Sequence, residues 1–264
     1  MLGARRAVVV SLAALLILLV SDAAWTRPPF APGDAYYQLA DNKYNRCTAG
    51  FLVKDTDGNF GILTAGHCDI REFDKPGPNG LCVSKVDPNE RAHLCHRVGH
   101  IADADLNDDI AREHARGEIG GFKYAVLDYD ASVDPDHFGA DDGLISINSN
   151  IRVTSKIAGN RAVTEAVDGQ QIRDSFIGSK VCKYGAVTEE TCGTIVSSTD
   201  TVVSIYGASF AHGDSGGPVY IVTDADRVIP IEVVSNSTYG DPHRFYAALI
   251  APMLDKWNLT LVTD

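Results

Sequence analysis

The secondary-structure signal along the chain is short and mostly of the β type. Apolar segments of strand length are separated by Gly, Asn, Asp and Pro, as in the turn Asp57-Gly58-Asn59. Because strands do not alternate with helical segments, the pattern predicts a barrel or a sandwich. One helix is expected, over residues 251–258. The expected strands are residues 48–53, 60–65, 96–102, 122–127, 180–184, 194–198, 202–206, 218–223, 228–235 and 244–248.

The composition is that of an ordinary globular protein. The chain has 264 residues, 45% of them hydrophobic and 22% charged, and can bury a full core in one large domain or two small ones. The 35 acidic residues outnumber the 23 basic ones, which gives a formal net charge of −12. This surplus argues against nucleic acid or an anionic membrane as a partner, and solubility is the simpler explanation.

Residues 1–23 have the pattern of an export signal. Arg5 and Arg6 precede the apolar run 7–20, and Ser21-Asp22-Ala23 ends it with a small-x-small cleavage pattern. The run is shorter than the about 20 residues of a transmembrane helix, so we favour a cleaved signal over a retained anchor. We therefore expect a secreted protein, at the cell envelope or outside the cell, with no membrane contact after cleavage. Residues 24–44 are expected to form an extended arm.

Residues 212–218, His-Gly-Asp-Ser-Gly-Gly-Pro, place Ser215 in a glycine-rich backbone. An alcohol is a poor nucleophile at its free pKa, and it needs a nearby base and amide donors for the oxyanion that forms on attack. Gly213 can adopt a positive φ and direct its N–H at that oxyanion, while Gly216 and Gly217 leave room for a substrate. A tight turn between strands is the alternative, because Gly, Asp and Ser are also turn residues.

A second motif supports the catalytic interpretation. Residues 63–68, Leu-Thr-Ala-Gly-His-Cys, end an apolar strand and deliver His67 into a bend. A lone histidine is more often structural than catalytic. One delivered by a strand, well before Ser215 in the chain, is a plausible base for that serine.

At these two motifs the chain resembles the chymotrypsin-like serine peptidase family. The residues that carry the resemblance are Thr-Ala-Gly-His-Cys at 64–68 and Gly-Asp-Ser-Gly-Gly at 213–217. The branch most similar is the bacterial one, that of alpha-lytic protease and the streptogrisins. The resemblance extends from about Cys47 to the C-terminus and is poor over residues 100–120 and 131–175.

The resemblance implies an all-β fold of two six-stranded antiparallel β-barrels with a C-terminal helix. The first barrel, residues 45–130, would carry His67. The second barrel and the helix, residues 176–264, would carry Ser215. Residues 131–175, which are rich in Asp and weakly periodic, would cross between the barrels.

Six cysteines in an exported chain indicate a disulfide framework, although the sequence alone leaves the pairing open. The resemblance implies Cys47–Cys68 beside the histidine and Cys182–Cys192 in a bridged hairpin, which leaves Cys82 and Cys95 to each other. The alternative is a metal site, but zinc thiolates are unusual where oxidation is allowed. We therefore expect no metal at Cys82, His93, Cys95 and His96.

Asp214 is not the catalytic acid in the family that the chain resembles. Its carboxylate turns inward and holds the oxyanion loop in shape. Animal members pair this carboxylate with a new N-terminus that begins Ile-Val-Gly-Gly, a sequence absent here. The bacterial branch uses a basic residue directly after the first cysteine of the bridged hairpin, and here that residue is Lys183. We expect a Lys183–Asp214 pair, because a buried carboxylate without a partner is destabilising; a solvated surface lysine is the alternative.

The resemblance also implies three substrate-binding residues. Ser209 matches the base of the specificity pocket, and the lack of a carboxylate there argues against a preference for Arg or Lys beside the scissile bond. Ser235 and Ser237 match the strand that pairs with the substrate backbone. Most relatives have glycine at the position of Ser237, so a side chain there should narrow the pocket and favour small or medium apolar residues.

The main departure from the family concerns the acid that supports the histidine. Bacterial relatives carry Asp at the start of a strand that reads Asp-Tyr-Gly/Ala-Val/Ile-Val/Leu, and the matching stretch here is Lys123-Tyr124-Ala125-Val126-Leu127. The acid position is then a lysine. Asp128 lies on the other face of that strand, and Glu118 could reach His67 only if its loop folds back.

Two functions follow from these residues. The first is an exported serine endopeptidase with Ser215 as nucleophile, His67 as base, and the N–H groups of Gly213 and Ser215 as oxyanion hole. It would act on peptides or proteins as a monomer without a cofactor. The second is a protease-like binding protein that has lost turnover, an interpretation favoured by Lys123.

Overall fold

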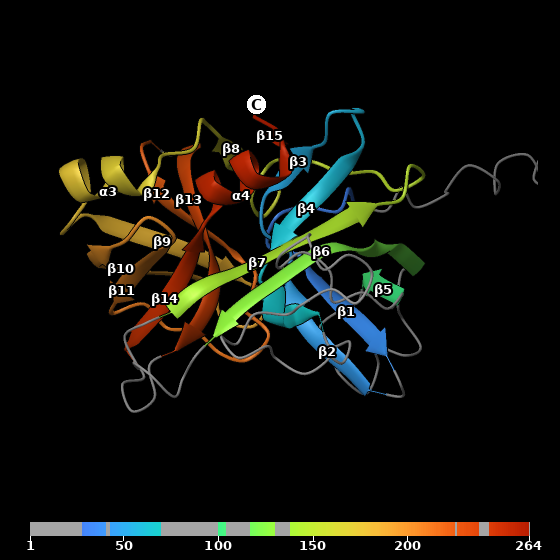
Figure 1. Ribbon diagram of the computed structural model, residues 1–264, viewed down its shortest axis with the longest axis horizontal. Helices are drawn as coiled ribbons and strands as arrows, with labels where there is room; N and C mark the ends of the chain where they lie inside the picture. The colour runs from blue at the N-terminus through green and yellow to red at the C-terminus, as the bar shows by residue number, and fades with distance from the viewer. Residues whose placement is uncertain are drawn as a thin grey trace, which may run out of the picture.

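The computed structural model describes residues 28–40, 43–69, 100–103, 117–129, 138–224, 226–237 and 243–263. These residues form two β-sheets that lie side by side, the first blue to green and the second mostly yellow to red in Figure 1. The predicted signal segment 1–23 and the predicted pair of Cys82 and Cys95 lie outside the described residues.

The first sheet has eight antiparallel strands in the order β15-β3-β4-β7-β6-β5-β1-β2. Its final strand, β15, comes from the end of the chain and pairs with β3. The strands are β1 (Ala35–Ala40), β2 (Lys43–Thr48), β3 (Leu52–Lys54), β4 (Phe60–Thr64), β5 (His100–Asp103), β6 (Gly117–Tyr129), β7 (Phe138–Ile147) and β15 (Thr260–Leu261).

The second sheet runs in the order β12-β9-β10-β11-β14-β13-β8, and an additional pairing of β12 with β13 closes six of its strands into a barrel. The two-residue strand β8 joins β13 in parallel. The predicted fold class, all-β with two antiparallel barrels and a C-terminal helix, is confirmed, although the first sheet has eight strands where six were expected. The strands are β8 (Ala162–Val163), β9 (Lys180–Gly185), β10 (Glu189–Ser198), β11 (Val202–Tyr206), β12 (Pro218–Val222), β13 (Arg227–Ser237) and β14 (Arg244–Leu249).

Two segments are used differently from the prediction. The interval 131–175, expected to cross between barrels, contains β7, which pairs with β4 and β6 inside the first sheet. The arm 24–44 contains β1, which pairs with β2 and β5. The hydrophobic pattern of β7 is weak because two of its buried residues, Asp141 and Asp142, are carboxylic acids, and apolar periodicity does not identify such a strand.

The turn between β3 and β4 shows how polar residues position these strands. Asp55 accepts hydrogen bonds at Oδ1 from the backbone N–H groups of Asp57, at 3.0 Å, and Asn59, at 2.9 Å. Gly58 has a φ of +83°, a conformation that side chains disfavour. The predicted turn at 57–59 is therefore present, and it directs β4 toward His67.

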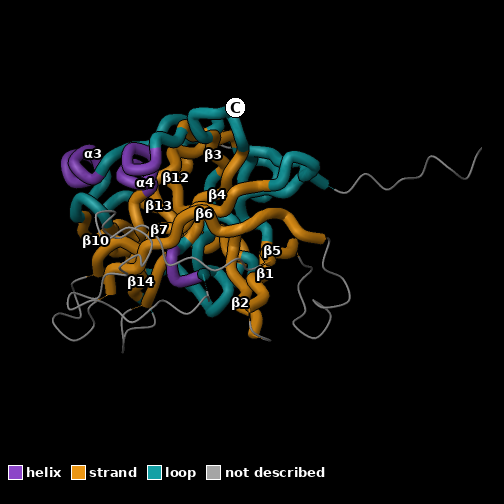
Figure 2. The backbone as a smooth tube through the Cα atoms, turned by 45° about the vertical axis from the view of Figure 1, so that its right-hand side comes forward, coloured by secondary structure: helices purple, strands orange, loops and turns teal. Residues whose placement is uncertain are grey.

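The described part of the chain contains two α-helices, which lie at the periphery of the strands (Figure 2). Helix α3 (Gly169–Ser175) begins with a capping box between Asp168 and Gln171. Helix α4 (Ile250–Trp257) was predicted within one residue at each end, and it stops at Asn258, which is left-handed with a φ of 50°. Among the described residues, no helix is both long and apolar enough to cross a membrane.

The core has three parts. One fills the first sheet, around Phe122 and Ile145, and another fills the closed barrel, around Ile205 and Phe245. The third joins residues of both sheets with α4, whose Trp257 stacks on Tyr124 at 5.3 Å between ring centroids. This shared core holds together the two sheets that carry His67, after β4, and the loop of Ser215, before β12.

Candidate active site

His67 lies in a short 3₁₀ turn, η1 (Gly66–Cys68), directly after β4. Its side chain is 32% exposed, so one face of the imidazole is open. Gly66 is needed in this turn, because a Cβ there would overlap the backbone carbonyl of Val126 on β6. The bend therefore presses against the neighbouring strand and turns the imidazole out of the sheet.

Asp141 of β7 supports His67. Its Oδ2 lies 2.7 Å from His67 Nδ1, and its Oδ1 accepts a 2.8 Å hydrogen bond from the His67 backbone N–H. The hydroxyl of Ser235 donates to the same carboxylate at 2.5 Å. The carboxylate is thus held in one orientation from both sheets.

The two charges shift each other's titration. Burial lowers the pKa of His67, but the charge of Asp141 and its hydrogen bond outweigh this effect and raise the pKa above its usual value. Burial raises the pKa of Asp141, and the interaction with His67 reverses that effect and leaves the pKa low. A carboxylate in this position fixes the imidazole tautomer and stabilises an imidazolium, which is the role of the acid in a catalytic triad.

The alignment of Lys123 with the triad acid was wrong. Lys123 Nζ lies 3.3 Å from Asp55 Oδ2, and its side chain is 41% exposed. The side chains of the other two candidates, Glu118 and Asp128, lie outside the described residues. A sequence signal for Asp141 was nonetheless present: residues 141–145 read Asp-Asp-Gly-Leu-Ile, which keeps the Asp, the Gly and two aliphatic residues of the family pattern but has Asp142 in place of the tyrosine.

Ser215 sits where the two sheets meet. Its carbonyl oxygen accepts a 2.8 Å hydrogen bond from the N–H of Thr48 on β2, and the N–H of Gly216 donates to Val234 on β13 at 2.7 Å. A Cβ on Gly216 would overlap Thr64 Oγ1, at the end of the strand that precedes His67. The glycine therefore permits the approach of the Ser215 loop to the histidine strand.

The loop has the backbone conformation expected from its glycines. Gly213 has a φ of +101° and Gly216 a φ of +82°. The hydroxyl of Thr48 donates to the Gly213 carbonyl at 2.6 Å, which fixes the orientation of the peptide unit between Gly213 and Asp214. In this conformation the backbone itself can supply the amide donors that an oxyanion needs.

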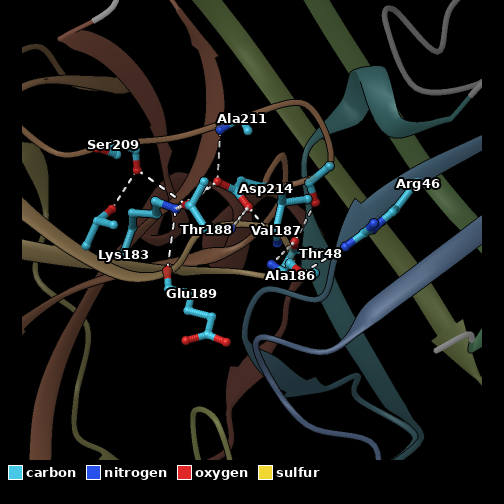
Figure 3. A network of polar contacts seen from close by, with 12 residues as sticks. Arg46, Thr48, Lys183, Ala186, Val187, Thr188, Glu189, Ser209, Ala211 and Asp214 are labelled. Atoms are coloured by element: carbon cyan, nitrogen blue, oxygen red, sulfur yellow. Dashed lines mark hydrogen bonds and ion pairs between the residues drawn. The ribbon is translucent and has the colours of Figure 1, made fainter. Parts of the chain in front are cut away.

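Asp214 points inward into a dense polar network (Figure 3). Lys183 Nζ lies 2.8 Å from Asp214 Oδ2, and both side chains are 0% exposed. The remaining donors to this carboxylate are the N–H groups of Val187, Thr188 and Ala211 and the hydroxyl of Thr188. Burial raises the pKa of Asp214, but the hydrogen bonds from Lys183 and Thr188 more than offset it and hold the pKa below its usual value.

The three predicted substrate-binding residues lie in different surroundings. Ser209 is exposed, and its carbonyl accepts a 2.6 Å hydrogen bond from Thr191. Ser235 is half-buried and donates to Asp141, a contact that the sequence did not indicate. Ser237 ends β13, with its backbone opposite Phe245, and its side chain lies outside the described residues.

Two of the three expected disulfides lie in the described part of the chain. Cys47 is bonded to Cys68 beside His67, and Cys182 to Cys192 across β9 and β10. The cluster of Cys47, His67 and Cys68 has the spacing of a metal site, but both sulfurs are in a disulfide and cannot act as thiolate ligands.

Solved structures of bacterial proteases share the fold of this chain. Thermobifida fusca protease A matches with a TM-score of 0.55 at 24% identity, over 89% of this chain and 99% of that one. A Nocardiopsis protease matches with a TM-score of 0.54 at 21% identity, over 89% and 99%. The alpha-lytic protease homolog N4 matches with a TM-score of 0.51 at 16% identity, over 87% and 98%. The chain therefore has the chymotrypsin-like double-barrel fold of bacterial serine proteases.

Sequence comparison extends less far. No protein-family model matches the chain. Two uncharacterized proteins of Mycobacterium tuberculosis, one from each of two strains, are 39% identical to it over 66 residues, which is 24% of this chain. The matched segment spans 28% of the length of these curated relatives.

Proposed function

We propose that this chain is an exported serine endopeptidase with the triad Ser215, His67 and Asp141. The observation that carries the proposal is the contact between Asp141 and His67 Nδ1 at 2.7 Å. With Nδ1 engaged, the proton of the neutral imidazole stays on that nitrogen, and Nε2 is left as the base. The Ser215 loop packs on the strand that delivers this imidazole.

The reaction proceeds in two balanced halves. Ser215 Oγ attacks the peptide carbonyl carbon while His67 Nε2 takes the hydroxyl proton, and His67 then gives that proton to the leaving nitrogen as the peptide bond breaks. Water next attacks the ester carbonyl, its proton passes to His67, and the same proton returns to Ser215 as the acid product leaves. The N–H groups of Gly213 and Ser215 stabilise the oxyanion in both halves.

Asp214 and Lys183 act at a distance from the reacting atoms. They hold the Gly213 backbone in its positive-φ conformation, so that the oxyanion donors are in place before the substrate arrives. Because Lys183 is part of the chain and already neutralises Asp214, the site forms without cleavage to create a new N-terminus.

The substrate would lie along β13. We assign the substrate backbone to residues 235–237 and the side chain before the scissile bond to a pocket floored by Ser209, which offers no carboxylate for a basic residue. Two disulfides in the described residues favour an oxidising, extracytoplasmic location. We further propose that the protein acts as a monomer without nucleic acid, membrane, metal or cofactor.

The alternative, a binding protein without turnover, rested on Lys123 at the acid position. Lys123 contacts Asp55, and the acid at His67 is Asp141. This geometry favours the enzyme.

A fluorophosphonate probe tests the proposal, because it forms a covalent bond only with an activated serine. We expect the wild type to be labelled at Ser215 and Ser215→Ala to be inert. Asp141→Asn should slow labelling by about 10⁴-fold, the loss of turnover that follows when the triad aspartate of a serine protease is replaced by asparagine. Absence of labelling in the folded wild type, or fast labelling in Asp141→Asn, would contradict the triad.

A further inference from the structure

Arg46 on β2 lies beside the oxyanion loop without a role in the triad. It directly precedes Cys47 of the bridge to Cys68. A Cβ placed on Gly213 would lie 3.5 Å from Arg46 Nε and 3.6 Å from Arg46 Cδ, which puts the side chain against that glycine. The residue as a whole is half-buried. Arg46 is therefore a fixed cation at the edge of the proposed active site.

The guanidinium is held in place by backbone. Its Nη2 donates a 2.8 Å hydrogen bond to the carbonyl of Ala186, in the turn between β9 and β10 (Figure 3). Its Nε is buried and has no hydrogen-bond partner among the described residues. A buried donor without an acceptor is destabilising, so the described residues satisfy the guanidinium only in part.

No carboxylate within the described ranges neutralises Arg46, which forms no ion pair there. Asp214, an acidic residue of the same network, is 0% exposed and already bound to Lys183. In Figure 3, Arg46 lies on the side of Asp214 away from Ser209. Because a guanidinium keeps its charge at all physiological pH values and its planar donors match a carboxylate, the missing partner is an anion.

The position of Arg46 indicates which half of a substrate it would contact. The backbone at Ser215 and Gly216 lies between Thr48 of β2 on one side and Val234 of β13 on the other. In the proposed function, the acyl half of the substrate follows β13. The leaving half is protonated by His67 and must depart past the Cys47–Cys68 bridge, which is the side of β2 and Arg46.

We propose that Arg46 is a specificity-determining residue that binds a carboxylate in the leaving half of the substrate, within the first residues after the scissile bond. The inference rests on the proposed peptidase function and extends it to a class of substrate. The carboxylate is that of an Asp or Glu side chain or of a free C-terminus. The planar fork of Arg46 would bind it from beside the oxyanion loop.

The test uses internally quenched peptides with one acyl half that the wild type cleaves. Glu, Gln or Lys is placed in turn at the first three positions after the bond, with an amidated C-terminus. A second set carries Gln throughout and ends in either a free carboxylate or an amide. We expect the wild type to prefer the carboxylate in one of these sets by about tenfold in kcat/KM, the scale of one hydrogen-bonded charge pair.

Variants assign that preference to Arg46. In Arg46→Gln, the ratio of kcat/KM for the Glu peptide to that for the Gln peptide, or for the free carboxylate to that for the amide, should fall close to one. Arg46→Glu should prefer the peptide with Lys after the scissile bond. Arg46→Lys, which keeps the charge but loses the fork, should retain part of the preference. Arg173→Gln, at a half-buried arginine of α3 that pairs with Asp200 at 2.7 Å, is the matched control and should keep the wild-type ratio. Melting temperatures verify that each variant is folded.

Failure of the inference is distinguishable from failure of the peptidase proposal. A wild type that is labelled by fluorophosphonate but shows the same ratios as Arg46→Gln overturns the role of Arg46 alone. If the wild type is not labelled, anisotropy of the same peptides on Ser215→Ala measures recognition without turnover. Equal affinity for the Glu and Gln peptides in that assay would also overturn the inference.

Discussion

Replacement of Lys183 by methionine should destabilise the protein strongly at neutral pH and less strongly near pH 4. Lys183 and Asp214 are both 0% exposed, and their charged atoms lie 2.8 Å apart. Methionine has about the same length and fits the same space, so the main loss is the positive charge. Asp214 would then be a buried carboxylate without a counter-ion.

The size of this effect follows from what remains around Asp214. Breaking a buried ion pair by removing one partner costs about 3–5 kcal/mol. Asp214 keeps four hydrogen bonds in the variant, from Val187, Thr188 and Ala211. We therefore expect the lower end of this range, about 3 kcal/mol.

The pH dependence gives the prediction its sign. In the wild type the pKa of Asp214 is lowered, so the pair stabilises the fold above the unfolded pKa, and this stability is lost as the pH falls through the folded pKa. In Lys183→Met the four hydrogen bonds remain, but no counter-charge opposes burial, which should raise the folded pKa of Asp214 above the unfolded value. Stability of the variant is then fully present at low pH and is lost as the pH rises.

Urea unfolding at pH 4 and pH 7, under non-reducing conditions, measures the difference. Lys183→Met combined with Asp214→Asn should recover part of the loss at pH 7, because no buried charge remains. Lys123→Met is the matched control: it removes an ion pair whose lysine is 41% exposed, and such a pair contributes about 1 kcal/mol at most. An equal loss in Lys183→Met at both pH values would refute the ionised buried pair.

Two further predictions concern residues outside the triad. Glu232 is 0% exposed, both its carboxylate oxygens have no hydrogen-bond partner among the described residues, and burial raises its pKa well above the usual value. Glu232 should therefore reduce the free energy of unfolding as the pH rises above its unfolded pKa, by up to about 1.4 kcal/mol per pH unit. Glu232→Gln should abolish this dependence of stability on pH in thermal unfolding. The same pH dependence in the wild type and the variant would contradict a protonated Glu232. Lys123→Asp should leave fluorophosphonate labelling unchanged and lower stability by at most about 1 kcal/mol through repulsion from Asp55, whereas a large gain in labelling rate would return position 123 to the active site.

The local chemistry of the two motifs was enough to identify His67 and Ser215 as candidates. Glycine permits backbone conformations that other residues disfavour, so the positive φ of Gly213 could be anticipated from residue type and spacing. Lys183 was paired with Asp214 through the resemblance, and the structure brings the two together. Each of these features can be read from residues that are adjacent in the sequence or from a residue's place within a known motif.

The acid was decided by tertiary structure. Two neighbouring strands both carry a fragment of the same pattern: β6 has Tyr124-Ala125-Val126-Leu127 and β7 has Asp141-Asp142-Gly143-Leu144. The two strands are neighbours in the sheet, with Ala125 opposite Gly143. Matching the pattern to β6 therefore assigned the acid to the strand next to the one that carries it. Only the side chain's contact with His67 Nδ1 distinguishes them.

The same holds for Ser235, Arg46 and Glu232. Ser235 was expected to bind substrate and not an acid, and Arg46 and Glu232 gave no signal, because an arginine and a glutamate are common in surface strands. Ser235 acquires its role from a carboxylate on the other sheet, Arg46 from a glycine far along the chain, and Glu232 from the closure of the second barrel around it. Sequence determined which chemical groups were available, and the packing of the two sheets determined which of them meet, because contacts between distant segments depend on strand register and not on local pattern.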